Sequence, residues 1–146
     1  MATDWINRYF EAWDGHDADG VVSFMTTDAV YEDLALGERY EGTQAIKAAV
    51  EGLESTISTD YRIQLRQVIV TDDAYSFEWT MSGTNDRADA QRGLPATGQR
   101  FEFPGVSVGV LRGGKIKDNR DYWNLAAYLT QVGLMPAPGS PDAGTV

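Results

Sequence analysis

The feature that most restricts the fold of this chain is a change of hydrophobic period near residue 60. Before it, aromatic residues recur at helical spacing: "TDWINRYFEAW" places Trp5, Tyr9 and Trp13 four residues apart. After it, "YRIQLRQVIV" and "AYSFEWTMSG" alternate apolar and polar side chains, with the short turn "TDD" between them. The first pattern is typical of an amphipathic helix and the second of a β-hairpin. Helices followed by meandering strands predict an α+β fold.

The remaining segments complete this pattern. A short helix is expected after the turn "DGHDADG", and a third helix after Thr43, a good N-cap residue. "AVYED" is expected to form a short strand, and "QRFEFPGVSVGVL" a long one. Pro104 and Gly105 inside the long strand predict a bulge or bend. "GGKIKDNRDYWNLAAYL" predicts a tight turn, the last strand and a short helix.

The predicted architecture is a cone-shaped α+β barrel. Three N-terminal helices pack on a strongly curved, mostly antiparallel sheet, and a short C-terminal helix follows the last strand. We expect residues 1–135 to form one domain, because no internal repeat or second domain is evident. Residues 136–146, "PAPGSPDAGTV", are expected to form a flexible C-terminal tail.

The long strand carries apolar residues on both faces. Phe101 and Phe103 lie on one face, and Val106, Val108 and Val110 on the other. The helices can cover only one of the two faces, and a large apolar sheet face open to water is unusual in a monomer. We therefore expect a homodimer packed through the sheet face.

Composition excludes several classes of function. The net charge of −10 opposes binding to nucleic acid and to anionic membrane surfaces. The chain has no cysteine, so thiol chemistry is excluded. It has one histidine, which is too few for a metal site built from histidines. The N-terminal segment lacks the basic start and apolar run of a secretion signal. We expect a cytoplasmic protein without metal or cofactor.

Two polar motifs are expected to have structural and not catalytic roles. His16 lies in a Gly/Asp turn, where a role in the loop or as a cap is expected. Asp86 and Asp89 belong to the connection "TNDRADAQRGLPATG", which is expected to be a solvated flap. Their spacing does not match a calcium-binding loop, so calcium is not expected there.

Three stretches together resemble a known family: "RYFEAWDGHDADGVVSFMTTDAVYED", "YEGTQAIKAAVEGL" and "GLPATGQRFEFPGVSVGVLRGGKIKDNRDYWNLAAYLTQVGL". They are similar to the SnoaL-like polyketide cyclases of the nuclear transport factor 2-like (ketosteroid isomerase-like) superfamily. The resemblance spans roughly residues 4–135. It implies a cone-shaped pocket between the helices and the concave sheet. The scaffold hosts isomerases, cyclases, dehydratases, epoxide hydrolases and non-catalytic binders, so the reaction stays open.

The resemblance also implies which residues carry the chemistry. SnoaL-type cyclases use an aspartate on the last strand as the acid/base of an aldol ring closure. Limonene epoxide hydrolase is similar, and its aspartate lies in an Arg-Asp-Tyr-aromatic run. The run "RDYW" assigns this role to Asp121. The hydrolase also holds a water with a Tyr-x-Asn sequence, which matches Tyr31 and Asp33 in "YED".

The central strand of the hydrolase carries an arginine and an aspartate two residues apart, and the matching positions here are Glu78 and Thr80. The arginine therefore has no counterpart. SnoaL-type cyclases also pair the aspartate with a polar residue on the neighbouring strand, often His, and Ser107 is the nearest candidate. The residues expected to line or edge the pocket are Trp13, Phe103, Gly105, Ser107, Asn119 and Trp123.

Asp121 is interesting on physical grounds as well. An aspartate between aromatic and apolar walls is poorly solvated, so its pKa rises from about 3.9 towards neutrality. Such a group can exchange protons at cellular pH. The alternative is an ordinary ion pair with Arg120 or Lys117 on a solvated strand. For Asp33 the alternative is a turn residue before "LALG".

The inward face of strand 75–83 has two interpretations. The hydrophobic alternation predicts that Tyr75, Trp79 and the other apolar residues of the same face point into the core, which leaves Glu78 in water. The resemblance implies instead that Glu78 and Thr80 point into the pocket, where Glu78 would share protons with Asp121. A shift of one residue inverts the answer.

Three functions stay open at this point. The first is a cofactor-independent acid/base enzyme of the cyclase or isomerase type, acting on a hydrophobic small molecule, with Asp121 as general acid/base and Tyr31 and Asp33 as positioning groups. The second is an epoxide hydrolase or epoxide-opening ether cyclase that uses acid pairs from Asp33, Glu78 and Asp121. The third is a non-catalytic small-molecule binding or dimerisation module.

Overall fold

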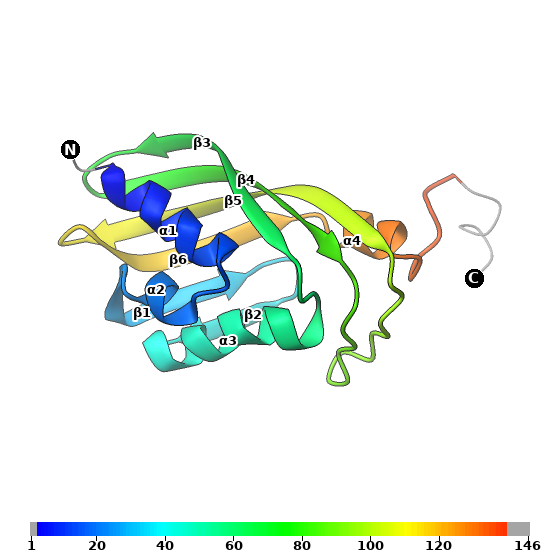
Figure 1. Ribbon diagram of the computed structural model, residues 1–146. Coiled ribbons are helices and arrows are strands. Elements are labelled where there is room, and N and C mark those ends of the chain that lie inside the picture. Colours follow the sequence, from blue (N-terminus) through cyan, green and yellow to red (C-terminus); the bar gives the residue numbers. More distant parts are fainter. Residues whose placement is uncertain (1–2, 140–146) are drawn as a thin grey trace.

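The computed structural model describes residues 3–139 and has the predicted α+β architecture. Its helices are α1 (Asp4–Asp14), α2 (Ala18–Val22), α3 (Thr43–Thr56) and α4 (Leu125–Gln131). Its strands are β1 (Met25–Asp33), β2 (Glu38–Glu41), β3 (Arg62–Val70), β4 (Ala74–Thr84), β5 (Arg100–Arg112) and β6 (Lys115–Trp123) (Figure 1).

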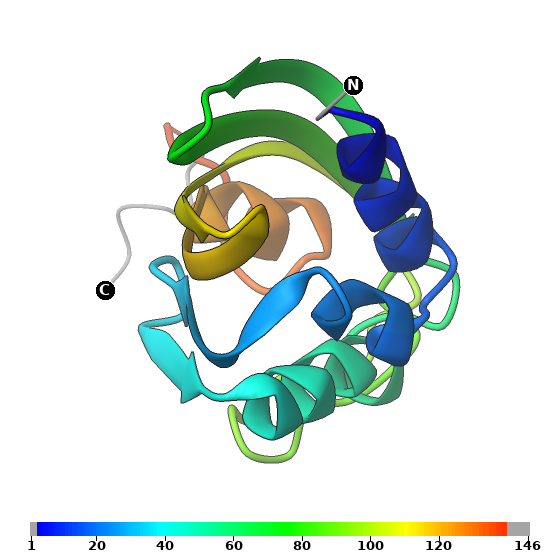
Figure 2. The same cartoon turned by 90° about the vertical axis from the view of Figure 1, so that its left-hand side faces the viewer.

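The described strands form one sheet with the order β2-β1-β6-β5-β4-β3. The pairing of β1 with β6 is parallel, and the other neighbours pair antiparallel. The sheet curls strongly, and α1, α2 and α3 close the open side of the curl (Figure 2). The prediction of a cone-shaped, mostly antiparallel α+β barrel with three N-terminal helices and a short C-terminal helix is therefore confirmed.

The aromatic face of α1 packs on the inner face of β4. Ile6, Tyr9, Phe10 and Trp13 are buried, and the rings of Phe10 and Phe77 meet edge to face with centroids 5.4 Å apart. This burial explains the four-residue spacing in the sequence, since one side of the helix forms the roof of the barrel.

Local boundaries differ from the predictions in two places. β1 begins four residues before the expected "AVYED" strand, and β2 was not predicted because "ERYE" is too short and polar to show a period. The N-cap of α3 is Gly42 and not Thr43. Gly42 has φ 86°, a conformation that glycine adopts without steric cost.

Of the bulge or bend predicted at Pro104 and Gly105, the bulge is wrong. β4 and β5 pair in continuous register from Ala74 opposite Val110 to Thr84 opposite Arg100. Packing explains the glycine at position 105 instead, because a Cβ atom there would lie 2.2 Å from Cη2 of Trp79. The glycine therefore leaves space for the indole ring.

Beyond α4, residues 135–139 are exposed. Residues 136–139 have no helix or strand, and residues 140–146 of the predicted tail lie outside the described residues. Within residues 3–139, the helices are all too short or too polar to cross a membrane. The cytoplasmic location stays a prediction.

Candidate active site

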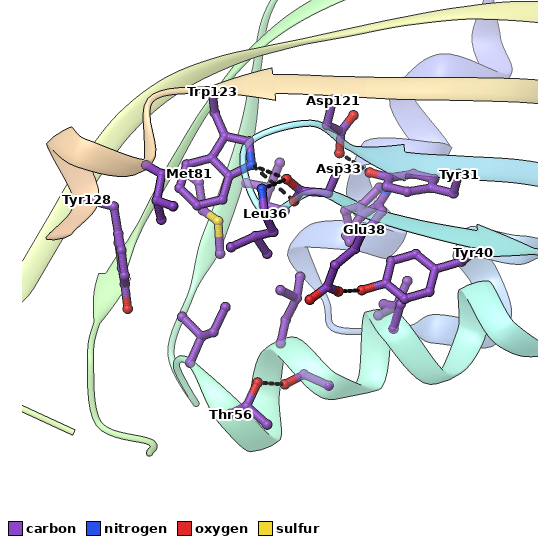
Figure 3. A pocket seen from close by; sticks show the side chains of 18 of the residues that line it. Tyr31, Asp33, Leu36, Glu38, Tyr40, Thr56, Met81, Asp121, Trp123 and Tyr128 are labelled. Atoms are coloured by element: carbon purple, nitrogen blue, oxygen red, sulfur yellow. Dashed lines mark hydrogen bonds between the residues drawn. The ribbon is translucent and has the colours of Figure 1, made fainter. Parts of the chain in front are cut away.

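A cavity of about 490 Å³ lies between the helices and the concave face of the sheet (Figure 3). α1 and α3 form one side, the inner faces of β1, β4, β5 and β6 form the other, and residues of the connection between β4 and β5 form part of the rim. Much of the wall is aromatic, with contributions from Tyr9, Trp13, Tyr31, Trp79, Phe103 and Trp123. A cavity of this size and composition suits an apolar small molecule.

Asp121 faces this cavity from β6 and is 8% exposed. Its Oδ1 atom accepts hydrogen bonds from Ser107 Oγ at 2.5 Å and from Asn119 Nδ2 at 2.8 Å. Its Oδ2 atom accepts a hydrogen bond from the hydroxyl of Tyr31 (Figure 3). The alternative ion pair is wrong, because Arg120 is exposed and bonds Tyr122, and Lys117 pairs with Asp118.

Burial raises the pKa of Asp121 from 3.8 to about 6. The hydrogen bonds from Ser107, Tyr31 and Asn119 stabilise the ionised carboxylate and oppose this rise, and the nearby charge of Asp33 adds to it. A carboxyl group with a pKa of about 6 populates both protonation states near neutral pH, as an acid/base group requires.

Tyr31 and Asp33 enter the cavity from β1, which lies beside β6. Burial raises the pKa of both groups, and the charge of Asp121 also raises the pKa of Tyr31. Asp33 accepts from the backbone N–H of Leu36 at 2.9 Å and from Trp123 Nε1 at 3.1 Å. Asp33 therefore fixes the turn after β1, as its alternative interpretation expected, and also lines the cavity.

The predicted lining residues divide into two groups. Trp13, Phe103, Ser107 and Trp123 lie in the cavity wall. Asn119 is 2% exposed and lies behind Asp121, to which it donates a hydrogen bond, while Gly105 lies under the indole of Trp79. Neither Asn119 nor Gly105 forms part of the wall itself.

Glu78 and Thr80 do not reach the cavity, which corrects the placement that the resemblance implied. Glu78 is exposed, and Thr80 accepts a hydrogen bond from Arg66 Nε at 2.9 Å on the convex face. Trp79 and Met81 are buried and line the cavity instead. The orientation of β4 predicted from hydrophobicity is the observed one, because burial of its large apolar side chains in the core is favourable.

An ionic cluster at the cavity rim was not found from the sequence. Arg92 binds both Glu38 and Asp89, and the Tyr40 hydroxyl also donates to Glu38. Asp89 is 3% exposed, so its prediction as part of a solvated flap is wrong. These residues come from β2 and from a connection without hydrophobic period, so the sequence carried no signal that joins them.

His16 has a structural role in its loop, as expected. Its Nδ1 atom lies 3.0 Å from Glu54 Oε1, and its Nε2 atom lies 2.7 Å from the carbonyl oxygen of Tyr61. Among residues 3–139, no group of three or more His, Cys, Asp or Glu side chains is arranged to hold a metal ion.

Comparison with known proteins supports the fold. The SnoaL-like domain family matches residues 6–119, whereas no curated protein matches the chain. A protein from Xanthomonas campestris designated a polyketide cyclase has 29% identity and a TM-score of 0.75, covering 90% of this chain and 96% of that one. A second from Silicibacter, also designated a polyketide cyclase, has 27% identity and a TM-score of 0.75, covering 89% and 93%.

A third similar structure, a ketosteroid isomerase-like fold from Catenulispora acidiphila in complex with trimethylamine, has 20% identity and a TM-score of 0.77. It covers 90% of this chain and 93% of that one, and at this identity it supports the fold alone. The family match extends over most of the chain, from α1 to the middle of β6. The chain belongs to the SnoaL-like domain family.

Proposed function

We propose that this protein is an acid/base enzyme of the cyclase or isomerase type that acts on a hydrophobic small molecule. The observation that carries the proposal is the Asp121 carboxyl group, which is buried at the wall of an aromatic cavity. Its raised pKa of about 6 allows it to accept and return a proton near neutral pH. The two similar proteins designated polyketide cyclases support the same class of reaction.

The chemistry follows from what faces the ligand. A carbonyl compound bound against the aromatic wall would present the C–H bond next to its carbonyl to Asp121. The ionised carboxylate removes that proton, and the C–H electrons form an enolate whose oxygen needs a hydrogen-bond donor. Tyr31, whose burial raises its pKa, stays protonated and is the donor nearest to Asp121. Return of the proton to another carbon gives isomerisation, and attack of the enolate on a second carbonyl gives ring closure.

Hydrogen–deuterium exchange tests the proposed proton transfer directly. Hydrophobic ketones would be incubated with the protein in D₂O, and exchange next to the carbonyl would be followed by NMR. We expect catalysed exchange in the wild type and a loss of about 10²- to 10⁴-fold in Asp121→Asn. Glu78→Gln is the matched control, since Glu78 lies on the convex face and its loss leaves the cavity unchanged. Full exchange in folded Asp121→Asn would remove the assignment.

Epoxide opening is a second candidate because the cavity holds a second carboxyl group. Asp33 lines the same wall, and burial raises its pKa as well. One carboxyl group could protonate the epoxide oxygen while the other activates a water or a ligand hydroxyl. Incorporation of heavy oxygen from labelled water into a diol would support hydrolysis. Binding of epoxides and ketones without turnover of either would support the binding-module alternative.

The homodimer also stays a proposal, supported by the convex face of the sheet. Val110 is 41% exposed and Tyr122 is 47% exposed, with Val106 and Val108 half-buried beside them. A second copy packed on this face would remove that apolar surface from water. Light scattering after size-exclusion chromatography should give the mass of a dimer, and Val108→Lys should give a monomer. A wild-type monomer at high concentration would contradict the proposal.

A further inference from the structure

The concave face of the sheet around Asp121 has a regular arrangement that the proposed function does not use. Neighbouring residues of β4, β5 and β6 form three rows: Trp79–Gly105–Trp123, Phe77–Ser107–Asp121 and Tyr75–Gly109–Asn119. Glycines therefore flank Ser107 on its own side of β5, in the sequence "GVSVG".

The two glycines make room for aromatic rings. A Cβ atom at Gly105 would lie 2.2 Å from Cη2 of Trp79, and one at Gly109 would lie 2.2 Å from Cζ of Tyr75. Such distances are impossible for real side chains, so any larger residue would displace the rings. The rings of Trp79 and Tyr75 thus lie across β5, where their polar ends reach the neighbours of Asp121.

Trp79 fixes the direction of the Ser107 hydroxyl group. Trp79 Nε1 donates a hydrogen bond to Ser107 Oγ at 2.9 Å. An indole N–H can only donate, so Ser107 must accept there and direct its own proton elsewhere. That proton goes to Asp121 Oδ1, 2.5 Å away.

Tyr75 fixes the orientation of the Asn119 amide in the same way. The Tyr75 hydroxyl donates to Asn119 Oδ1 at 2.6 Å, which turns Nδ2 towards Asp121 Oδ1 at 2.8 Å. The flipped amide would set its carbonyl oxygen against the carboxylate, an arrangement without a shared proton. Asp121 Oδ1 therefore faces two fixed donors, while Oδ2 faces Tyr31.

We propose that Trp79 and Tyr75 are positioning residues that confine the exchangeable proton of Asp121 to Oδ2, on the side of Tyr31. A proton on Oδ1 would lie against the Asn119 N–H group and the Ser107 hydroxyl, which could accept it only by turning its own hydrogen away, whereas a proton on Oδ2 can be donated to the Tyr31 oxygen. The ligand's reacting atom then approaches the edge formed by Oδ2 and the Tyr31 hydroxyl, and this last point rests on the proposed acid/base function.

At that edge, one proton arrives from the ligand and the Tyr31 hydroxyl changes its hydrogen-bond partner. In the ionised state, Tyr31 donates to Oδ2. When the ligand's C–H bond breaks, a new O–H bond forms at Oδ2 and points to the Tyr31 oxygen. The Tyr31 hydrogen is thereby released from the carboxylate and can turn to the ligand oxygen that has gained negative charge. The same two atoms thus serve the base and the donor.

The test is the pH titration of the Asp121 carboxyl group by carbon-detected NMR, on ligand-free protein. In Trp79→Phe, Ser107 becomes free to turn and accept a proton from Oδ1, and in Tyr75→Phe the Asn119 amide becomes free to flip. Both changes stabilise the protonated acid. We expect the titration midpoint to rise above about 6 by about one pH unit in each variant.

Two control variants remove similar groups without this connection. Trp123→Phe removes an indole that bonds Asp33, and Tyr128→Phe removes a buried hydroxyl that bonds Asn85. Neither should raise the midpoint of Asp121 by a comparable amount. An unmoved midpoint in folded Trp79→Phe and Tyr75→Phe, or equal rises in the controls, would overturn the proposal.

Neutron diffraction provides an independent measurement that needs no variant. Crystals held below the pKa of about 6 should carry a deuteron on Oδ2, next to Tyr31. A deuteron on Oδ1 would overturn the proposal. Both measurements are separate from turnover, so a failure of Asp121→Asn to lose activity would remove the proposed function and leave the positioning role standing.

Discussion

Asp33 and Asp121 lie opposite each other in the parallel pairing of β1 and β6, and both carboxyl groups face one apolar cavity. Burial raises the pKa of each, and the charge of Asp33 contributes to the rise at Asp121. Among the described residues that line the cavity, Arg92 is the one cationic side chain, and it is already bound to Glu38 and Asp89. Asp33 thus raises the pKa of Asp121, and no free cation among these described residues offsets its charge.

The first prediction concerns this coupling. Asp33→Asn removes a negative charge from the cavity, so the pKa of Asp121 should fall below about 6. Carbon-detected NMR titration of the Asp121 carboxyl group measures the change directly. Glu78→Gln, which removes a carboxylate from the convex face, should leave the midpoint nearly unchanged. Equal effects of the two substitutions would argue against a local coupling in the cavity.

The second prediction is a pH-dependent stability. Because the folded-state pKa of Asp121 is raised from 3.8 to about 6, the folded protein holds a proton that the unfolded chain releases in this window. The contribution of Asp121 to stability is therefore largest below pH 3.8 and decreases by about 3 kcal/mol as the pH rises through about 6.

The measurement is urea unfolding of wild type and Asp121→Asn across this pH range. The difference in unfolding free energy between the two should change by about 3 kcal/mol in favour of the variant as the pH rises. Other titrating groups act on both proteins and largely cancel. A constant difference across the range would mean that the carboxyl group is not desolvated in the fold.

The third prediction concerns the rim of the cavity. Arg92→Ala leaves the 3% exposed Asp89 without its cation and releases the connection between β4 and β5 from Glu38. We expect a loss of about 1–3 kcal/mol in unfolding free energy, together with weaker ligand binding. Arg87→Ala changes an exposed arginine of the same connection and should be nearly neutral. Similar losses in both variants would contradict a specific role for Arg92.

The fourth prediction compares two glycines. Gly105→Ala drives a methyl group into the Trp79 ring, so it should destabilise the fold and disturb the hydrogen bond from Trp79 to Ser107. Gly52→Ala in α3 meets nothing within 4 Å and should stabilise the helix by about 0.5–1 kcal/mol. Thermal unfolding distinguishes the two. A neutral Gly105→Ala would show that the ring has other room.

The fold was predictable because its signals are periodic. The four-residue spacing from Trp5 to Trp13 and the alternation in β4 identified the elements, and a one-residue slip would have moved Phe77 out of the core. β2 was missed because its four polar residues show no such period. Asp121 could be located because its "RDYW" run, at the end of the last strand, matches the run that the resemblance implied.

The rest of the site depends on contacts between distant residues. Glu78 and Thr80 were misplaced by the resemblance, although the hydrophobic alternation of the same strand indicated the correct face. Arg92 meets Glu38 across 54 positions of sequence, and no local pattern encodes that contact. The "GVSVG" stretch did carry a signal, since glycines two residues either side of Ser107 indicate that something large lies over the strand.

The central claim is that the Asp121 carboxyl group lies in a water-poor cavity and exchanges protons near neutral pH. Titration of this carboxyl group by carbon-detected NMR in the wild-type protein is the most direct test. The structure predicts a midpoint of about 6. A midpoint at the ordinary value of 3.8 would contradict the account, because the carboxyl group would then be as well solvated as any surface aspartate.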